Sequence, residues 1–228
     1  MNRTDTFILL YNQLDEYLAQ VTDEDTRTPF YSLVEKAVQR RLIRKRDEAT
    51  LKKYGSLRNL IVHDADYPER VLAEPTEETL AEFGRIVQRL KNPRTLNEFR
   101  HEVRTFSERD ALALALEHMR TEDFSQVVVR DENSLALLTT EGVAKWLERQ
   151  RETFDLTGTT IKDALEHEIP GSFQVVSRRD TLEQAQEVFT EALERGQPRL
   201  YALIVTENGR PHETPLGIVT PWDAIEDD

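Results

Sequence analysis

A threonine and an aspartate three residues apart stand at the end of a strand-like segment, in the sequence LGIVTPWD. Thr220 closes the apolar run, and Asp223 falls in the first turn of the short helix expected to follow. At such a junction the free backbone N–H groups and the helix dipole favour a phosphate, to which the Thr220 hydroxyl can donate. The Asp223 carboxylate suits the two hydroxyls of a ribose. The alternative is structural: Thr220 caps the helix and Asp223 lines its first turn.

A second threonine, Thr139, holds the matching place in an earlier segment, LALLTTEG. Gly142 stands where Asp223 stands in the later segment. The carboxylate for a ribose is therefore missing here, unless Glu141 turns in from the neighbouring position. The comparison predicts one competent site and one degenerate site.

These two threonines end corresponding parts of an internal repeat that begins at Thr95 and again at Thr160. Each copy is expected to run through a short initial segment, a strand, a helix, two strands and a final helix, and two copies would pack together. The expected elements are strands at 126–129 and 135–139 with a helix at 108–119 capped by Ser107, and strands at 173–176, 200–205 and 216–220 with a helix at 181–193. Trp146 and Trp222 are interpreted as packing residues of the final helices.

The second copy resembles a CBS module, on the signature LGIVTPWD and on the order of its elements. The resemblance extends over residues 95 to 228 and implies a pseudo-symmetric pair of modules. The clefts of such pairs often bind an adenine nucleotide (AMP, ADP or ATP) as a regulatory ligand. The resemblance gives Thr220, Asp223 and Thr139 ligand-binding roles, and no cofactor. A further cleft wall is expected from the strand FQVV, with Val175 and Val176 holding the base and Ser177 beside them.

Residues 4–91 predict a small bundle of four helices joined by short loops. Apolar residues recur at helical spacing, and the third helix is expected to bury Leu51, Leu57, Leu60 and Ile61. Thr76, followed by two glutamates, predicts the start of the fourth helix.

The third helix also carries the sequence SLRNLIVHD. Asn59 and His63 are four residues apart and share a helix face, whereas Arg58 and His63 lie about 140° apart around the axis. Arg58 and His63 would converge only through a bend, a helix end near His63, or a second chain related by symmetry. The alternative is a purely structural role: His63 forms a hydrogen bond at a helix end, and Arg58 is a surface charge or pairs with a buried carboxylate.

The same motif resembles that of the HEPN family, a helical and often dimeric family with many metal-independent ribonucleases. The resemblance would make His63 the general acid or base for attack of an RNA 2′-hydroxyl on its phosphate. Arg58 would stabilise the charge on the phosphate and Asn59 would position it. No cluster of His, Asp and Glu at ligand spacing indicates a metal site.

The charge is unevenly distributed. The 228 residues carry a net charge of −13, yet the stretch from Lys36 to Arg58 has nine basic and two acidic residues. Such a stretch indicates either a solvated helix face or a surface for RNA phosphates. The chain has no cysteine, no signal-peptide pattern and no apolar run long enough for a membrane span, which fits a cytoplasmic protein without disulfides.

These observations predict an α+β protein with a HEPN-like helical bundle at 1–92 and CBS modules at 93–155 and 156–228. The expected function is regulatory: an adenine nucleotide binds the tandem modules, which signal to the helical domain of a homodimer. The alternatives are a HEPN-like ribonuclease gated by the nucleotide, and a dimerisation scaffold without a ligand.

Overall fold

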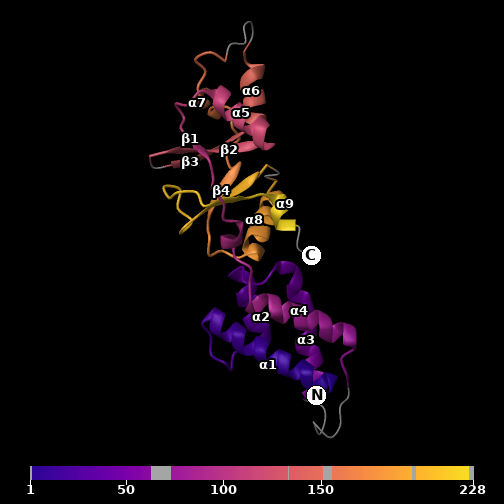
Figure 1. The fold of residues 1–228 in the computed structure, drawn as a ribbon. Coiled ribbons are helices and arrows are strands. Elements are labelled where there is room, and N and C mark those ends of the chain that lie inside the picture. The colour runs from indigo at the N-terminus through magenta and orange to yellow at the C-terminus, as the bar shows by residue number, and fades with distance from the viewer. Residues whose placement is uncertain (1, 63–72, 133, 151–155, 197–198, 226–228) are drawn as a thin grey trace. The chain divides into compact units, whose positions relative to one another are not determined.

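The computed structural model describes residues 2–62, 73–132, 134–150, 156–196 and 199–225. The chain divides into two compact units, Met1–Arg94 and Thr95–Asp228. The first unit is helical, and the second combines helices with two three-stranded sheets (Figure 1), so the predicted α+β class is confirmed. None of the helices in these residue ranges is both long and apolar enough to cross a bilayer.

The described part of the N-terminal unit contains α1 (Arg3–Thr22), α2 (Phe30–Gln39), α3 (Lys45–Val62) and α4 (Glu77–Lys91). The centre of its core is aromatic: the ring centroids of Phe7, Tyr54 and Phe83 lie between 4.6 and 6.2 Å apart. The Thr76 hydroxyl accepts a hydrogen bond from the backbone N–H of Thr79 at 3.1 Å. Thr76 is therefore the N-cap of α4, as its sequence predicts.

The prediction that Leu60 of α3 is a core residue is wrong. Leu51 and Ile61 are fully buried, but Leu60 is 50% exposed. Because residues nine apart on an α-helix differ by about 180° around its axis, Leu60 lies on the face opposite Leu51.

The C-terminal unit contains the same order of elements twice. The first set is η1 (Leu96–Phe99), β1 (Thr105–Phe106), α5 (Leu112–Glu122), β2 (Gln126–Asp131), β3 (Ser134–Thr139) and α6 (Thr140–Glu148). The second set is α7 (Ile161–Leu165), β4 (Phe173–Ser177), α8 (Leu182–Glu194), β5 (Ala202–Thr206), β6 (Gly217–Val219) and α9 (Pro221–Ile225). In each sheet the first strand pairs parallel to the second, and the second pairs antiparallel to the third.

Both first strands end in the same turn, which corrects the predicted cap of α5. That helix begins at Leu112, four residues later than expected, so Ser107 does not cap it. Instead the backbone N–H of Ser107 donates to Asp110 at 2.8 Å, and that of Ser177 donates to Asp180 at 2.9 Å. The sequences SERD and SRRD thus form equivalent turns in the two copies.

The short helix at the start of each copy packs on the sheet of the other copy. Leu96 of η1 is buried against β5, β6 and α8, whereas Ile161 and Ala164 of α7 lie in the core of the first sheet. Isolated β-bridges fix the two crossings, between Thr95 and Thr181 and between Ala111 and Thr160. Each sheet is therefore covered in part by the short helix of the other copy, so the two copies are interlocked.

A further apolar cluster joins the two sheets face to face, with α5, α6 and α7 outside the first and α8 and α9 outside the second (Figure 1). Val128 and Leu137 from β2 and β3 meet Ile204 and Ile218 from β5 and β6 in this layer. The alternation of side chains along each strand places one face in this layer and the other against the helices.

Candidate functional site

The junction between β6 and α9 is a closed turn. The backbone N–H and the hydroxyl of Thr220 both donate to the same oxygen of Asp223, Oδ2, each at 2.7 Å. The structural alternative from the sequence is thus present, because Asp223 satisfies groups at the start of α9. The second carboxylate oxygen, Oδ1, accepts no hydrogen bond from the part of the chain that the structure describes. Capping the turn and binding a ligand through Oδ1 are therefore compatible.

The residue before Asp223 carries an exposed indole. Trp222 is 77% exposed, so the prediction of a packing residue is wrong here, whereas Trp146 of α6 is buried in the core of the first sheet at 6% exposed. α9 has only five residues and buries Ala224; Trp222, two residues earlier and about 200° around the helix axis, faces solvent. α9 thus carries an exposed aromatic ring at Trp222, and at Asp223 a carboxylate with one oxygen that accepts no hydrogen bond from the described residues.

The strand register separates Ser177 from this turn. Phe173 pairs with Ala202, and Leu203 pairs with Val219, so Thr220 lies at the end of the sheet where β4 begins. Ser177 ends the same strand, four residues and about 13 Å further along. Its hydroxyl donates to the backbone oxygen of Glu207 at 3.2 Å.

The two valines predicted to hold a base face opposite sides of β4. Val175 packs in the layer between the sheets, and Val176 packs against the core that contains α8. Adjacent residues on a strand alternate between its faces, so the two side chains do not line one cleft. Of the predicted ligand-binding residues of the second copy, Thr220 and Asp223 lie together. Ser177 lies at the far end of β4, and Val175 and Val176 cannot both face the turn at Thr220.

The matching turn at Thr139 is closed by a residue from another segment. The backbone N–H and hydroxyl of Thr139 donate to Glu168 Oε1 at 2.6 and 3.0 Å, and the hydroxyl also lies 3.1 Å from Oε2. The Thr139 oxygen accepts from the backbone N–H of Gly142 at 3.0 Å, which caps α6. Glu168 therefore supplies the carboxylate that the sequence comparison finds missing.

Glu141 does not take that place. Its carboxylate forms a salt bridge with Lys145 at 3.0 Å, and it accepts hydrogen bonds from the guanidinium of Arg199 and the hydroxyl of Tyr201. Arg199 and Tyr201 belong to the second copy, so Glu141 connects α6 to the start of β5. The sequence offered no signal for this contact, since its partners lie about 60 residues away.

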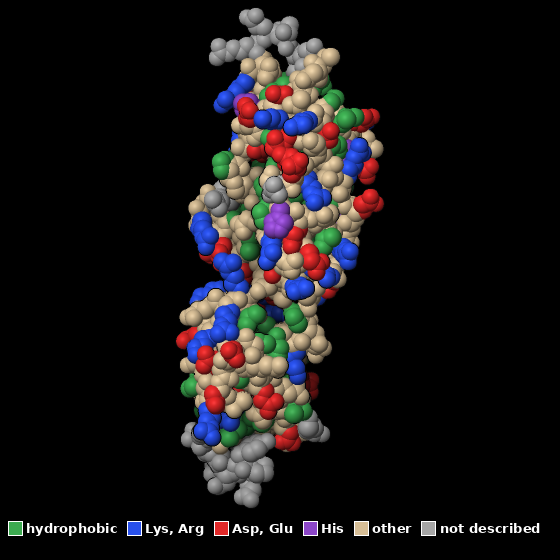
Figure 2. Space-filling model, turned by 90° about the vertical axis from the view of Figure 1, so that its left-hand side faces the viewer, with side chains coloured by type: hydrophobic (Ala, Val, Ile, Leu, Met, Phe, Trp, Pro, Cys, Tyr) green, Lys and Arg blue, Asp and Glu red, His purple; other side chains and the backbone are tan. Residues whose placement is uncertain are grey.

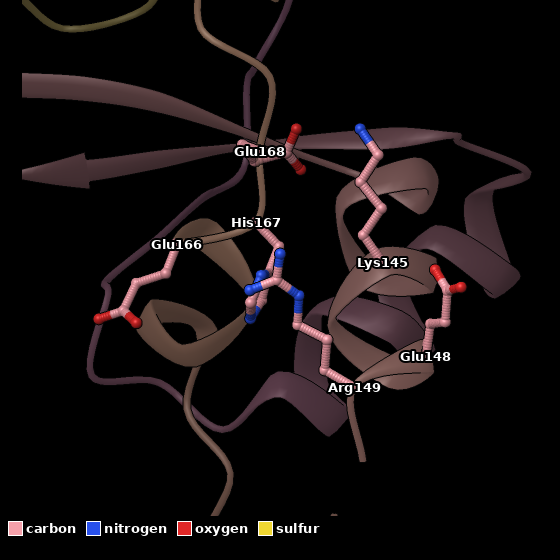
Figure 3. Close-up of a pocket in the computed structure, with 6 residues that line it drawn as sticks. All are labelled: Lys145, Glu148, Arg149, Glu166, His167 and Glu168. Carbon is pink, nitrogen blue, oxygen red and sulfur yellow. The ribbon is translucent and has the colours of Figure 1, made fainter. Parts of the chain in front are cut away.

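A surface pocket of about 450 Å³ opens beside Glu168 (Figure 3). Its lining comes from the C-terminal half of α6 and the segment after α7: Lys145, Glu148, Arg149, Glu166, His167 and Glu168. The side chains of Lys145 and Glu168 point to the same side of the pocket, while Glu166 points away. Burial raises the pKa of Glu168, and the hydrogen bonds from Thr139 and the charge of Lys145 oppose that rise only in part.

The raised pKa of Glu168 predicts a pH-dependent contribution to stability. The folded protein binds this proton more tightly than the unfolded chain, whose carboxyl has its ordinary pKa of 4.5. As the pH falls from neutral towards 4.5, the free energy of unfolding of the wild type should rise relative to that of Glu168→Gln. Urea unfolding of both proteins across this range measures the difference, with Glu166→Gln as the control for removing a pocket charge. A difference that does not change with pH would contradict the assignment.

On the helical unit, the structure places two of the three predicted catalytic residues. Arg58 lies 5.6 Å from the ring centre of Tyr11, its Nε has no hydrogen-bond partner among the described residues, and its Nη1 is 3.5 Å from the side-chain oxygen of Asn59. Asn59 is exposed. His63 lies outside the described residues. Arg58 thus packs on Tyr11 of α1.

Part of the basic stretch is balanced by acidic side chains of the same unit. Lys36, Arg44, Lys45 and Lys52 form ion pairs with glutamates and an aspartate at distances between 2.5 and 3.1 Å. In the space-filling view, Lys and Arg side chains are interspersed with Asp and Glu rather than gathered in one patch (Figure 2). These pairs reduce the charge available to attract the phosphates of RNA.

No protein-family model matches the sequence, and no curated protein matches it significantly. The similar solved structures are CBS-domain proteins. One from Kribbella flavida, of unknown function, is 18% identical with a TM-score of 0.43, covering 58% of this chain and 95% of its own. CBSX2 in complex with AMP is 16% identical with a TM-score of 0.41, covering 58% and 93%. A hexameric CBS-CP12 protein from bloom-forming cyanobacteria is 16% identical with a TM-score of 0.44, covering 60% and 74%.

Proposed function

We propose that the C-terminal unit is a tandem pair of CBS-type modules that binds an adenine nucleotide at Thr220 and Asp223 and acts as a regulatory sensor. The observation that supports it most is the Asp223 carboxylate, which holds Thr220 with one oxygen and leaves the other free. A carboxylate in this position would accept hydrogen bonds from a ribose, and the exposed ring of Trp222, the preceding residue, offers a face on which a base can stack.

The chain has a direct connection through which binding would reach the helical unit. The segment that follows α4 runs along β6, the strand that leads into Thr220: the backbone N–H of His101 donates to Leu216 at 3.0 Å. Leu96, five residues after the end of α4, is fully buried in the same core. We propose that a shift of β6 on nucleotide binding moves this segment and thereby α4. Hydrogen exchange of α4 amides with and without nucleotide measures that response.

Calorimetric titration of AMP, ADP, ATP and GTP into the full chain tests the binding site. We expect one of the adenine nucleotides to bind, and Asp223→Ala to weaken that binding by tenfold or more, since a hydrogen bond to a charged group contributes about 1.5–3 kcal/mol. GTP measures the selectivity for adenine.

The chain offers a matched control at Asp163, which caps α7 in the same way. The backbone N–H and hydroxyl of Thr160 both donate to Asp163 Oδ2 at 2.8 Å. Asp163→Ala and Asp223→Ala should each lose about 1 kcal/mol of stability as capping variants, but only Asp223→Ala should lose nucleotide binding. Equal nucleotide affinity of the two variants would show that the ligand binds away from Asp223. If the wild type binds none of the nucleotides, the sensor function is contradicted and the pair of modules is a scaffold without a ligand.

A further inference from the structure

We propose that Glu168 is a built-in occupant of the first turn, which excludes nucleotide from Thr139 and limits the protein to one bound nucleotide per chain. The inference rests on the proposed function for its ligand, but its geometry is independent of it. It identifies the residue that makes the two otherwise equivalent turns different.

Two hydrogen bonds are common to the two turns. In the second turn the N–H and hydroxyl of Thr220 meet one oxygen of Asp223, and in the first the same groups of Thr139 meet one oxygen of Glu168. Asp223 approaches from within its own turn, three residues on, and keeps Oδ1 free. Glu168 approaches from 29 residues away, and its second oxygen also lies within 3.1 Å of the Thr139 hydroxyl. Both carboxylate oxygens of Glu168 are thus in contact with Thr139.

Gly142 is required for this approach. A Cβ atom at position 142 would lie 2.0 Å from Glu168 Oε1 and 2.4 Å from its Cδ, closer than any side chain tolerates. The space that an aspartate would fill in a Thr-x-x-Asp turn is therefore filled by the end of Glu168. The closure of the first turn therefore depends on both residues: Gly142 leaves the space, and Glu168 fills it.

The consequence for a ligand is both steric and electrostatic. Thr139 is 2% exposed, and its donors are already used, so no ribose or phosphate reaches them while Glu168 is in place. The other charged groups that line this pocket are Lys145, Glu148, Arg149 and Glu166, and Lys145 is paired with Glu141. The negative charge of the Glu168 carboxylate at Thr139 would repel a phosphate that approaches this threonine.

A melting comparison tests the contact without any ligand. Gly142→Ala should lower the melting temperature of the wild type, because the new methyl group expels the Glu168 carboxylate from Thr139. In a Glu168→Ala background the same substitution should raise the melting temperature, because alanine favours the helix over glycine. Equal shifts of the melting temperature in both backgrounds would overturn the proposed contact.

Nucleotide stoichiometry tests the consequence. The double variant Gly142→Asp/Glu168→Ala rebuilds a Thr-x-x-Asp turn at Thr139 and removes the occupant. Calorimetry with the adenine nucleotide that binds the wild type should change from one site per chain to two. One site in both proteins, with the variant folded by circular dichroism, would overturn the inference. Absence of binding to both would overturn the proposed function and the exclusion role together, while the melting comparison would still decide the contact.

Discussion

Gly217→Ala should destabilise the C-terminal unit by about 3 kcal/mol, the upper end of the usual cost of overpacking. A Cβ atom at this position in β6 would lie 2.3 Å from the backbone oxygen of Phe99 and 3.2 Å from its carbonyl carbon. Because the obstacle is backbone rather than the end of a flexible side chain, β6 or the segment carrying Phe99 must move. The segment follows directly on the helical unit, so the substitution also disturbs the proposed connection between the C-terminal unit and α4.

Urea unfolding followed by circular dichroism measures this loss. Gly84→Ala makes the same chemical change in α4, where the nearest atom to the new methyl group, Leu10 Cδ1, is 3.8 Å away. That control should be stabilising by up to about 1 kcal/mol, because alanine is the better helix former. A Gly217→Ala protein as stable as the wild type would show that η1 does not lie against β6 as described.

Leu96→Ala should cost about 3 kcal/mol, within the range for a fully buried leucine. Leu96 precedes the first sheet in sequence, yet its side chain is 0% exposed in the core of the second sheet, together with Leu203 and Val219. The substitution would leave a cavity in the module that carries Thr220. It should therefore also weaken nucleotide binding, although Leu96 belongs to the first copy of the repeat.

Leu193→Ala is the control for this experiment, since Leu193 belongs to α8 of the same module and is 64% exposed. Its substitution should change the free energy of unfolding by less than about 0.5 kcal/mol. Similar losses for the two leucines, or none for Leu96, would contradict the interlocked arrangement of the copies.

The positions of the helices and strands follow from local patterns in the sequence. The apolar stripes of α1 and α4 and the β-branched runs of β2, β4 and β5 specify their own elements, because each buries one or both faces. The predicted helix cap at Ser107 is wrong for a local reason, because the S-x-R-D turn contains the same residue types as a helix start. The recurrence of S-x-R-D after the first strand of each copy is the sequence signal for that turn.

The crossing of η1 and α7 and the closure of Thr139 were not predictable in this way. Both depend on contacts between residues far apart in the sequence, such as Leu96 with Val219 and Thr139 with Glu168. A leucine in a short helix gives no indication of which sheet it packs on. Gly142 in the first turn of α6 was a usable signal, because a glycine at a helical position often marks a close approach by another group.

The most direct test of the account is a crystal structure of the full chain with bound AMP. The account predicts the nucleotide at the second turn alone, with a ribose hydroxyl within hydrogen-bond distance of Asp223 Oδ1 and Glu168 still bound to Thr139. Nucleotide at Thr139 with Glu168 displaced, or at a place that contacts neither turn, would contradict it.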